Sequence, residues 1–170
     1  MPYDIITVTP TLDTSTYAAN DVLFTSTEIK LPHSKCAVTH ISAVWADIHA
    51  ADDEIILMFF KENTNQLGTI NDAPNITGVK IAQNVLLGVS RINSNGTDHA
   101  LDVSDNVQAP VLFANFNVND EGEGETFAAP VVLVQGTTRN TCYVQALLEN
   151  TGGSTTAPAD SLVITLHVEY

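Results

Sequence analysis

Alternation of apolar and polar residues is the dominant pattern along this chain, and it is clearest near the C-terminal end. In Leu162–Tyr170 every second residue is apolar, and Val163, Thr165, His167 and Glu169 fall between these positions. Successive side chains of a β-strand point to opposite faces of the sheet. A period of two therefore predicts a strand with one buried face and one more polar face.

Similar runs predict that most of the chain is built from strands. One helix is predicted over Asn75–Leu87, where apolar residues partly fit a helical period. Short strands separated by turn residues, without regularly alternating helices, predict an all-β fold. We expect a single-domain antiparallel β-sandwich or jelly roll over residues 1–170, with at most one short helix. The predicted strands are Ile5–Leu12, Val22–Leu31, Val38–Ile48, Ile55–Lys61, Leu86–Ile92, Val111–Val118, Pro130–Gln135, Thr141–Leu148 and Leu162–Tyr170.

Several connections between these strands are rich in turn residues. Asp13–Asp21 joins the first two predicted strands, and its Asp, Ser and Asn residues favour a hairpin-type or arch connection. The strand Ile55–Lys61 is apolar until its end, which predicts that both of its faces are covered. Long polar loops are predicted at Asn93–Ala109, Asn119–Ala129 and Asn150–Asp160.

The net charge excludes some classes of partner. Six Lys and Arg residues against 20 Asp and Glu residues give a net charge of −14. Proteins that bind nucleic acid neutralise phosphates with clustered basic residues, and the six basic residues here are scattered singly. We therefore expect no nucleic-acid partner and no membrane partner. The N-terminus carries no signal-peptide pattern, which predicts synthesis in a cytoplasm.

The two cysteines, Cys36 and Cys142, are far apart in the sequence and belong to no metal-binding motif. A disulfide between them is geometrically possible, but a reducing cytoplasm disfavours it. We predict that both are buried free thiols.

Candidate chemical groups are few. The histidines are predicted to have structural or surface roles. The carboxylates of Asp47, Asp52, Asp53 and Glu54 could perform acid–base chemistry, but a solvated turn is favoured. Asp120–Glu125 could hold calcium, but an acidic surface loop is favoured. We therefore expect no enzyme, no catalytic or cofactor-binding residue, no cofactor and no metal ligand. The histidines are His33, His40, His49, His99 and His167.

Three segments carry a resemblance to a known group of proteins. Asp13–Asp21, which runs directly into Val22-Leu23-Phe24, resembles the N-terminal region of small all-β virion proteins of tailed bacteriophages, among them head decoration (cement) proteins. The resemblance continues in Asn84–Ser90 and in Leu162–Tyr170.

The resemblance implies a capsid decoration protein that binds the outer surface of the major capsid protein lattice and stabilises the head. It implies a homotrimer, made in the host cytoplasm and located in the virion on the outer head surface. Met1–Asp4 and the loop Asn93–Ala109 are the candidate capsid contacts. The alternatives are a receptor- or carbohydrate-binding module of a phage fibre, and a neck or tail component.

Overall fold

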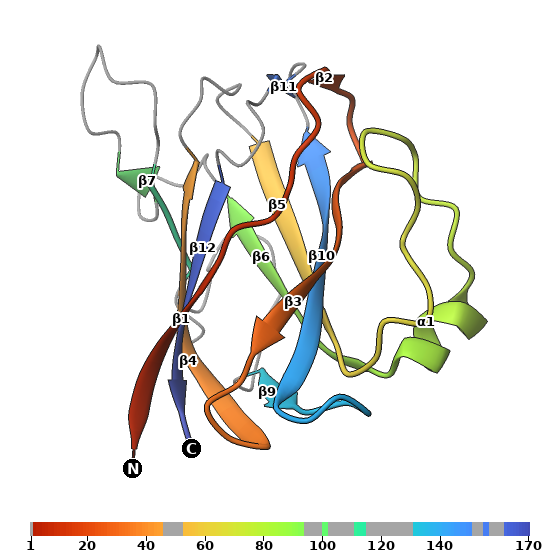
Figure 1. Ribbon diagram of the computed structural model, residues 1–170. Helices are drawn as coiled ribbons and strands as arrows, with labels where there is room; N and C mark the ends of the chain where they lie inside the picture. Colours follow the sequence, from red (N-terminus) through yellow and green to blue (C-terminus); the bar gives the residue numbers. More distant parts are fainter. Residues whose placement is uncertain are drawn as a thin grey trace, which may run out of the picture.

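The computed structural model describes residues 2–45, 53–93, 100–101, 111–114, 131–150, 155–156 and 162–170. Two antiparallel sheets face each other (Figure 1). The first sheet contains, in spatial order, β1 (Tyr3–Val8), β12 (Leu162–Glu169), β4 (Lys35–Trp45), β8 (Val111–Ala114) and β7 (Ala100–Leu101), and β9 (Val132–Val134) also pairs with β4. The second contains β3 (Asp21–Lys30), β10 (Thr141–Asn150), β5 (Asp53–Phe60) and β6 (Leu86–Asn93). A small pair is formed by β2 (Thr16–Tyr17) and β11 (Thr155–Thr156).

The path of the chain between the two sheets is that of a jelly roll. The chain passes from β1 to β3, back to β4, then to β5 and β6, back to β8, across to β10 and finally to β12. This gives the strand orders β1-β12-β4-β8 and β3-β10-β5-β6. In the first sheet β12 lies between β1 and β4, and in the second β10 lies between β3 and β5, as in double-sheet jelly rolls. The predicted all-β antiparallel sandwich with one short helix is confirmed.

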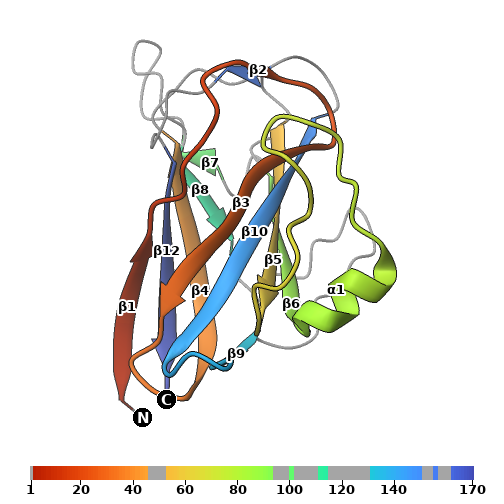
Figure 2. The same cartoon turned by 45° about the vertical axis from the view of Figure 1, so that its right-hand side comes forward.

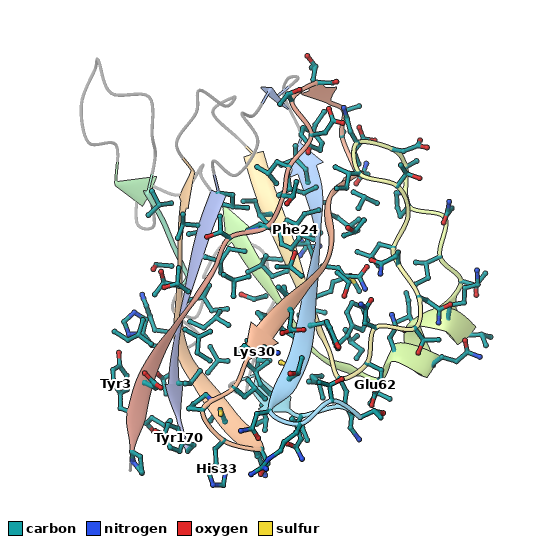
Figure 3. All side chains as sticks on the ribbon, viewed as in Figure 1. Tyr3, Phe24, Lys30, His33, Glu62 and Tyr170 are labelled. Atoms are coloured by element: carbon teal, nitrogen blue, oxygen red, sulfur yellow. The ribbon has the colours of Figure 1, made fainter. Side chains whose placement is uncertain are left out.

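The core lies between the sheets and follows the alternation seen in the sequence. On β12 the apolar Leu162, Ile164, Leu166 and Val168 are all buried, whereas the residues between them are half-buried. The second sheet contributes large side chains to this core, including Phe24 of β3 (Figure 3). Each fully buried side chain of this size contributes about 1.5–3 kcal/mol to stability.

The connection Asp13–Asp21 is an arch, because β1 and β3 belong to different sheets. At its centre Tyr17 is fully buried, and its hydroxyl donates to Leu23 O at 3.1 Å and accepts the Asp13 N–H at 2.7 Å. Burial raises the pKa of Tyr17 to about 12, so it is a neutral phenol at physiological pH. The Asp21 carboxylate accepts the Ala18 N–H at 2.7 Å, which is the turn chemistry expected of this segment.

The helix is shorter than predicted. α1 spans Gly78–Asn84 and begins after Thr77, whose hydroxyl caps it by accepting the Lys80 N–H. It ends at Val85, whose left-handed backbone stops the helical path. The remaining residues of the predicted Asn75–Leu87 helix therefore belong to a loop and to the start of β6.

The segment between β5 and β6, residues 61–85, covers the outer side of the second sheet (Figure 2). Leu67 from this segment packs with Val22 and Phe60 in a second apolar cluster, with Met58 and Leu147 at its margin. Phe60 and Met58 thus contact residues outside the main core, which confirms that β5 is covered on both faces.

Buried amides tie this covering segment to the sheet. Asn84 donates to Asn65 O at 2.6 Å and accepts the Asn65 N–H at 2.9 Å. Gln145 of β10 accepts the Leu67 N–H at 2.8 Å and donates to Asn65 O at 3.2 Å. Because buried polar groups are costly without partners, this connected set holds the segment in one position.

Cys36 of β4 and Cys142 of β10 are both buried and unpaired, as predicted. Burial raises the pKa of Cys36 and raises that of Cys142 to about 12. Both side chains are therefore neutral thiols with little nucleophilic character.

Candidate interaction surface

The outward side of the first sheet is formed by alternate residues of its three longest neighbouring strands, and we call it the β1–β12–β4 face. The register pairs Ile5 with His167 and His167 with His40, so side chains far apart in the sequence lie in one row. These residues are exposed or half-buried, in contrast to their buried neighbours along each strand. The face consists of Tyr3, Ile5 and Thr7 of β1, Val163, Thr165, His167 and Glu169 of β12, and Ala37, His40, Ser42 and Val44 of β4.

The β1–β12–β4 face is nearly uncharged, although the chain carries a net charge of −14. Of the residues that define the face, Glu169 alone is a carboxylate and none is Lys or Arg. Lys35 lies at the start of β4, beyond the last pair that β4 makes with β12. Little charge would therefore have to be dehydrated when another protein covers this face.

Aromatic and histidine side chains gather at one end of the β1–β12–β4 face. The Tyr3 hydroxyl is hydrogen-bonded to Nδ1 of His167, and the ring of His167 meets that of His40 edge-on at 5.2 Å between centroids. At the margin, His33 stacks on Tyr170 at 5.9 Å between centroids, near Tyr3 in Figure 3. Burial and, second, the neighbouring His167 lower the pKa of His40, so its imidazole is neutral at pH 7.

Large apolar side chains on this face and at its margin are open to solvent. Tyr3 and Ile5 are each 52% exposed, and Val44 and Tyr170 are each 38% exposed. The outer side of the second sheet is instead covered by residues 61–85. A protein partner on the β1–β12–β4 face would do for the first sheet what this segment does for the second.

β1 is also an edge strand of its sheet. Tyr170 donates its N–H to Pro2 O at 3.2 Å, and hydrogen bonding alternates along an antiparallel pair. The main-chain groups directed away from β12 are therefore those of Tyr3, Ile5 and Thr7. The Asp4 carboxylate accepts the Ile5 N–H at 2.8 Å, which occupies one of these edge donors.

A second group of exposed apolar residues lies on the opposite flank of the molecule, around α1 (Figures 1 and 2). Val79, Val85 and Leu86 are 69%, 45% and 41% exposed, and we call these three residues the α1 tip. The backbone of Val85 has φ 56° and ψ 83°, a left-handed conformation. For a residue other than glycine this costs about 1–2 kcal/mol.

The candidate chemical groups of the sequence are placed as follows. His40 and His167 are brought together, His33 stacks on Tyr170 at the margin of the face, and His49 and His99 lie outside the described residues. Within the described part of the chain, no three His, Cys, Asp or Glu side chains are arranged to hold a metal ion. The described residues also include no helix with the length and hydropathy of a membrane span.

The acidic candidates fall mostly outside the described residues. Asp47, Asp52 and the loop Asp120–Glu125 lie there, and of Asp53 and Glu54 only the backbone in β5 is described. Of the two candidate capsid contacts, Pro2–Asp4 lies at the edge of the β1–β12–β4 face, whereas most of the loop Asn93–Ala109 lies outside the described residues. The row of His40, His167 and Ile5 could not be predicted from the sequence. Alternation shows which residues of a strand share a face, but it does not show which strands are neighbours in the sheet.

Comparison with known proteins gives one distant structural likeness and no match by sequence. No protein-family model matches the chain, and no curated protein matches it. A solved structure described as Desmodium yellow mottle tymovirus is similar at 11% sequence identity, with a TM-score of 0.32, over 98% of this chain and 85% of that chain. A TM-score of 0.32 is too low to support a functional argument, so the proposal below rests on the residues of this chain.

Proposed function

We propose that this chain is a structural protein of a virus particle, and that it works by binding other proteins through the β1–β12–β4 face. The observation that carries the proposal is the outer side of the first sheet, which is nearly uncharged in a strongly acidic chain and which no described segment covers. Exposed Tyr3 and Tyr170 supply the tyrosine side chains in which protein interfaces are enriched. A surface made of three neighbouring strands suits a protein partner better than a small ligand, which is usually held in a concave site.

The jelly-roll path supports this class of function by analogy. Viral capsid proteins are among the groups of proteins built on double-sheet jelly rolls, although lectins and cupins share the architecture. The resemblance of Asp13–Asp21, Asn84–Ser90 and Leu162–Tyr170 to virion proteins of tailed bacteriophages selects the first group.

In its specific form, the proposal is a capsid decoration protein. The β1–β12–β4 face would lie on the major capsid protein lattice at the outer surface of the head, and the protein would assemble as a homotrimer after synthesis in the host cytoplasm. Each copy would add a modest contact, and the sum over many copies would resist internal pressure. A net charge of −14 suits an outer position, because it would repel packaged DNA. No catalysis, nucleic-acid binding or membrane binding is part of this role.

Binding of the purified chain to capsids tests the proposal. Wild-type protein should co-sediment with expanded capsids more strongly than with unexpanded procapsids, because the mature arrangement of subunits would complete the binding surface. Ile5→Asp places a charge in the β1–β12–β4 face and should weaken binding at least about tenfold. Ala73→Asp adds the same charge at an exposed position of the segment that covers the second sheet, and should leave binding unchanged.

Equal binding by the two variants would contradict the assignment of this face. If removal of the protein from the particle abolished adsorption to host cells but left head stability unchanged, the receptor-binding alternative would replace the decoration role. Thermal unfolding of both variants controls for loss of the fold.

A further inference from the structure

The exposed large apolar side chains of the described residues fall into only two groups. One group belongs to the β1–β12–β4 face and its margin, and the other is the α1 tip. The two groups lie on opposite flanks of the sandwich in both views (Figures 1 and 2). A surface that binds the capsid leaves the second group without a role. The groups are Tyr3, Ile5, Val44 and Tyr170, and Val79, Val85 and Leu86.

Among the described residues, Val85 is the one least suited to its backbone conformation. Four described residues other than glycine have a positive φ, and three of them are asparagines, which tolerate this region. The fourth is Val85, a β-branched residue, for which such a backbone is an outlier. Asparagine or glycine would relieve the strain.

The backbone at Val85 is held in place on both sides. Its N–H donates to Ala82 O at 3.1 Å, and its carbonyl accepts the Lys61 N–H at 3.0 Å. Its side chain nevertheless remains 45% exposed, so packing within the chain does not compensate for the strain. Strained positions persist where the surrounding structure holds them, and they concentrate at functional sites. Burial against a partner would give the side chain of Val85 a role.

The charge around the α1 tip indicates the chemistry of that partner. From Gly78 to Val89 the single charged residue is Lys80, which is exposed. The adjacent Lys61 and Glu62, whose N–H groups donate to Val85 O and Asn84 O, carry opposite charges that cancel, so this region is positive in a chain of net charge −14. An apolar surface with one cation is complementary to an acidic protein surface. A second copy of this chain, with its net charge of −14, supplies carboxylates at the same concentration as the tip itself.

We infer that the α1 tip is a contact between copies, in which Val79, Val85 and Leu86 pack against a second copy of this chain and Lys80 pairs with one of its carboxylates. The contact joins the tip to a different surface of the next copy, because pairing two tips would bring Lys80 against Lys80. Such a head-to-tail contact closes a ring when its rotation permits. The tip and the β1–β12–β4 face lie on opposite flanks, so both can be occupied at once. The inference does not depend on a virion role.

Sedimentation equilibrium of the purified full chain tests the inference. The wild-type protein should associate reversibly. Val85→Asn should raise the melting temperature by a few degrees, because the strain is relieved, and should weaken association at least about tenfold, because the side chain is lost from the contact. Lys80→Glu should also weaken association, with an effect that becomes smaller at high salt. Asn20→Gly, at an exposed position with φ 68°, is the matched control and should not change association.

The inference is overturned if the wild-type chain stays monomeric up to roughly 1 mM, the weak end of specific affinities. It is also overturned if Val85→Asn stabilises the chain and association is unchanged. Should Val85→Asn lower the melting temperature, Leu86→Ser and Lys80→Glu decide: weaker association in both supports the contact, and wild-type association in both excludes it. Capsid binding is not needed for any of these readouts, so failure here is distinct from failure of the virion role.

Discussion

His167 of β12 lies directly opposite His40 of β4, and the two imidazole rings meet edge-on with their centroids 5.2 Å apart. The pair lies on a sheet surface that carries almost no charge, and the Tyr3 hydroxyl is hydrogen-bonded to Nδ1 of His167. Burial and, second, the neighbouring His167 disfavour the charged form of His40. A drop in pH therefore acts directly on the surface proposed to bind other proteins.

The first prediction concerns the pH dependence of stability. The folded-state pKa of His40 lies below the ordinary value of 6.5, so the unfolded chain takes up this proton first as the pH falls. The contribution of neutral His40 to stability is complete at neutral pH. It is lost between about pH 6.5 and the lower folded-state pKa, and then levels off. His40→Gln should reduce the fall in melting temperature between about pH 7.5 and 5.5.

His33→Gln is the matched control for this measurement, because it removes a histidine that stacks on Tyr170 outside the pair. If both variants lose melting temperature with pH as steeply as the wild type, the pair does not contribute to acid sensitivity.

The arch between β1 and β3 gives a second prediction. Tyr17→Phe removes a buried hydroxyl that serves both Leu23 O and the Asp13 N–H, and leaves these groups without their partner. The free energy of unfolding in urea should fall by about 1–3 kcal/mol. Tyr143→Phe, on the half-buried side of β10, should change it by less than about 0.5 kcal/mol. Equal effects would show that the arch is not held by this hydroxyl.

The third prediction concerns two glycines whose replacement by alanine should change the free energy of unfolding in opposite directions. A Cβ at Gly136 would lie 2.2 Å from Lys61 O, so Gly136→Ala must displace the backbone and should cost roughly 1–3 kcal/mol. A Cβ at Gly78 would meet nothing within 4 Å, and Gly78 opens α1. Gly78→Ala should therefore raise the free energy of unfolding by about 0.5–1 kcal/mol. Both values can be measured by urea unfolding, and a neutral Gly136→Ala would contradict the close packing of this turn on residues 61–62.

Much of the fold follows from local patterns in the sequence, because alternation of apolar residues reflects burial directly. The apolar residues of Leu162–Tyr170 face the core as predicted up to Val168, and the turn chemistry of Asp13–Asp21 is present. The local pattern left a hairpin and an arch open at Asp13–Asp21, since that choice depends on which sheet receives β3. The neighbours of a strand are likewise set by the global topology, so the meeting of His40 and His167 could not be read from either segment alone.

The α1 tip shows a different limit of the sequence pattern. Val79 and Val85 both fit the apolar period that predicts a helix over Asn75–Leu87, yet both are exposed. A helical period identifies one side of a helix but not whether that side faces the chain's own core or a partner. The left-handed backbone of Val85 was also hidden, because valine is not a residue that signals the end of a helix.

The most direct test of the central claim is a cryo-EM reconstruction of intact virus particles that carry this protein. We predict density for the jelly roll on the outer surface of the head, with Tyr3, Ile5 and His167 of the β1–β12–β4 face against the capsid shell. Particles that lack the protein should show bare lattice at these positions and should release their genome at a lower temperature. Density in which this face points to solvent, or protein found only on fibres, neck or tail, would contradict the account.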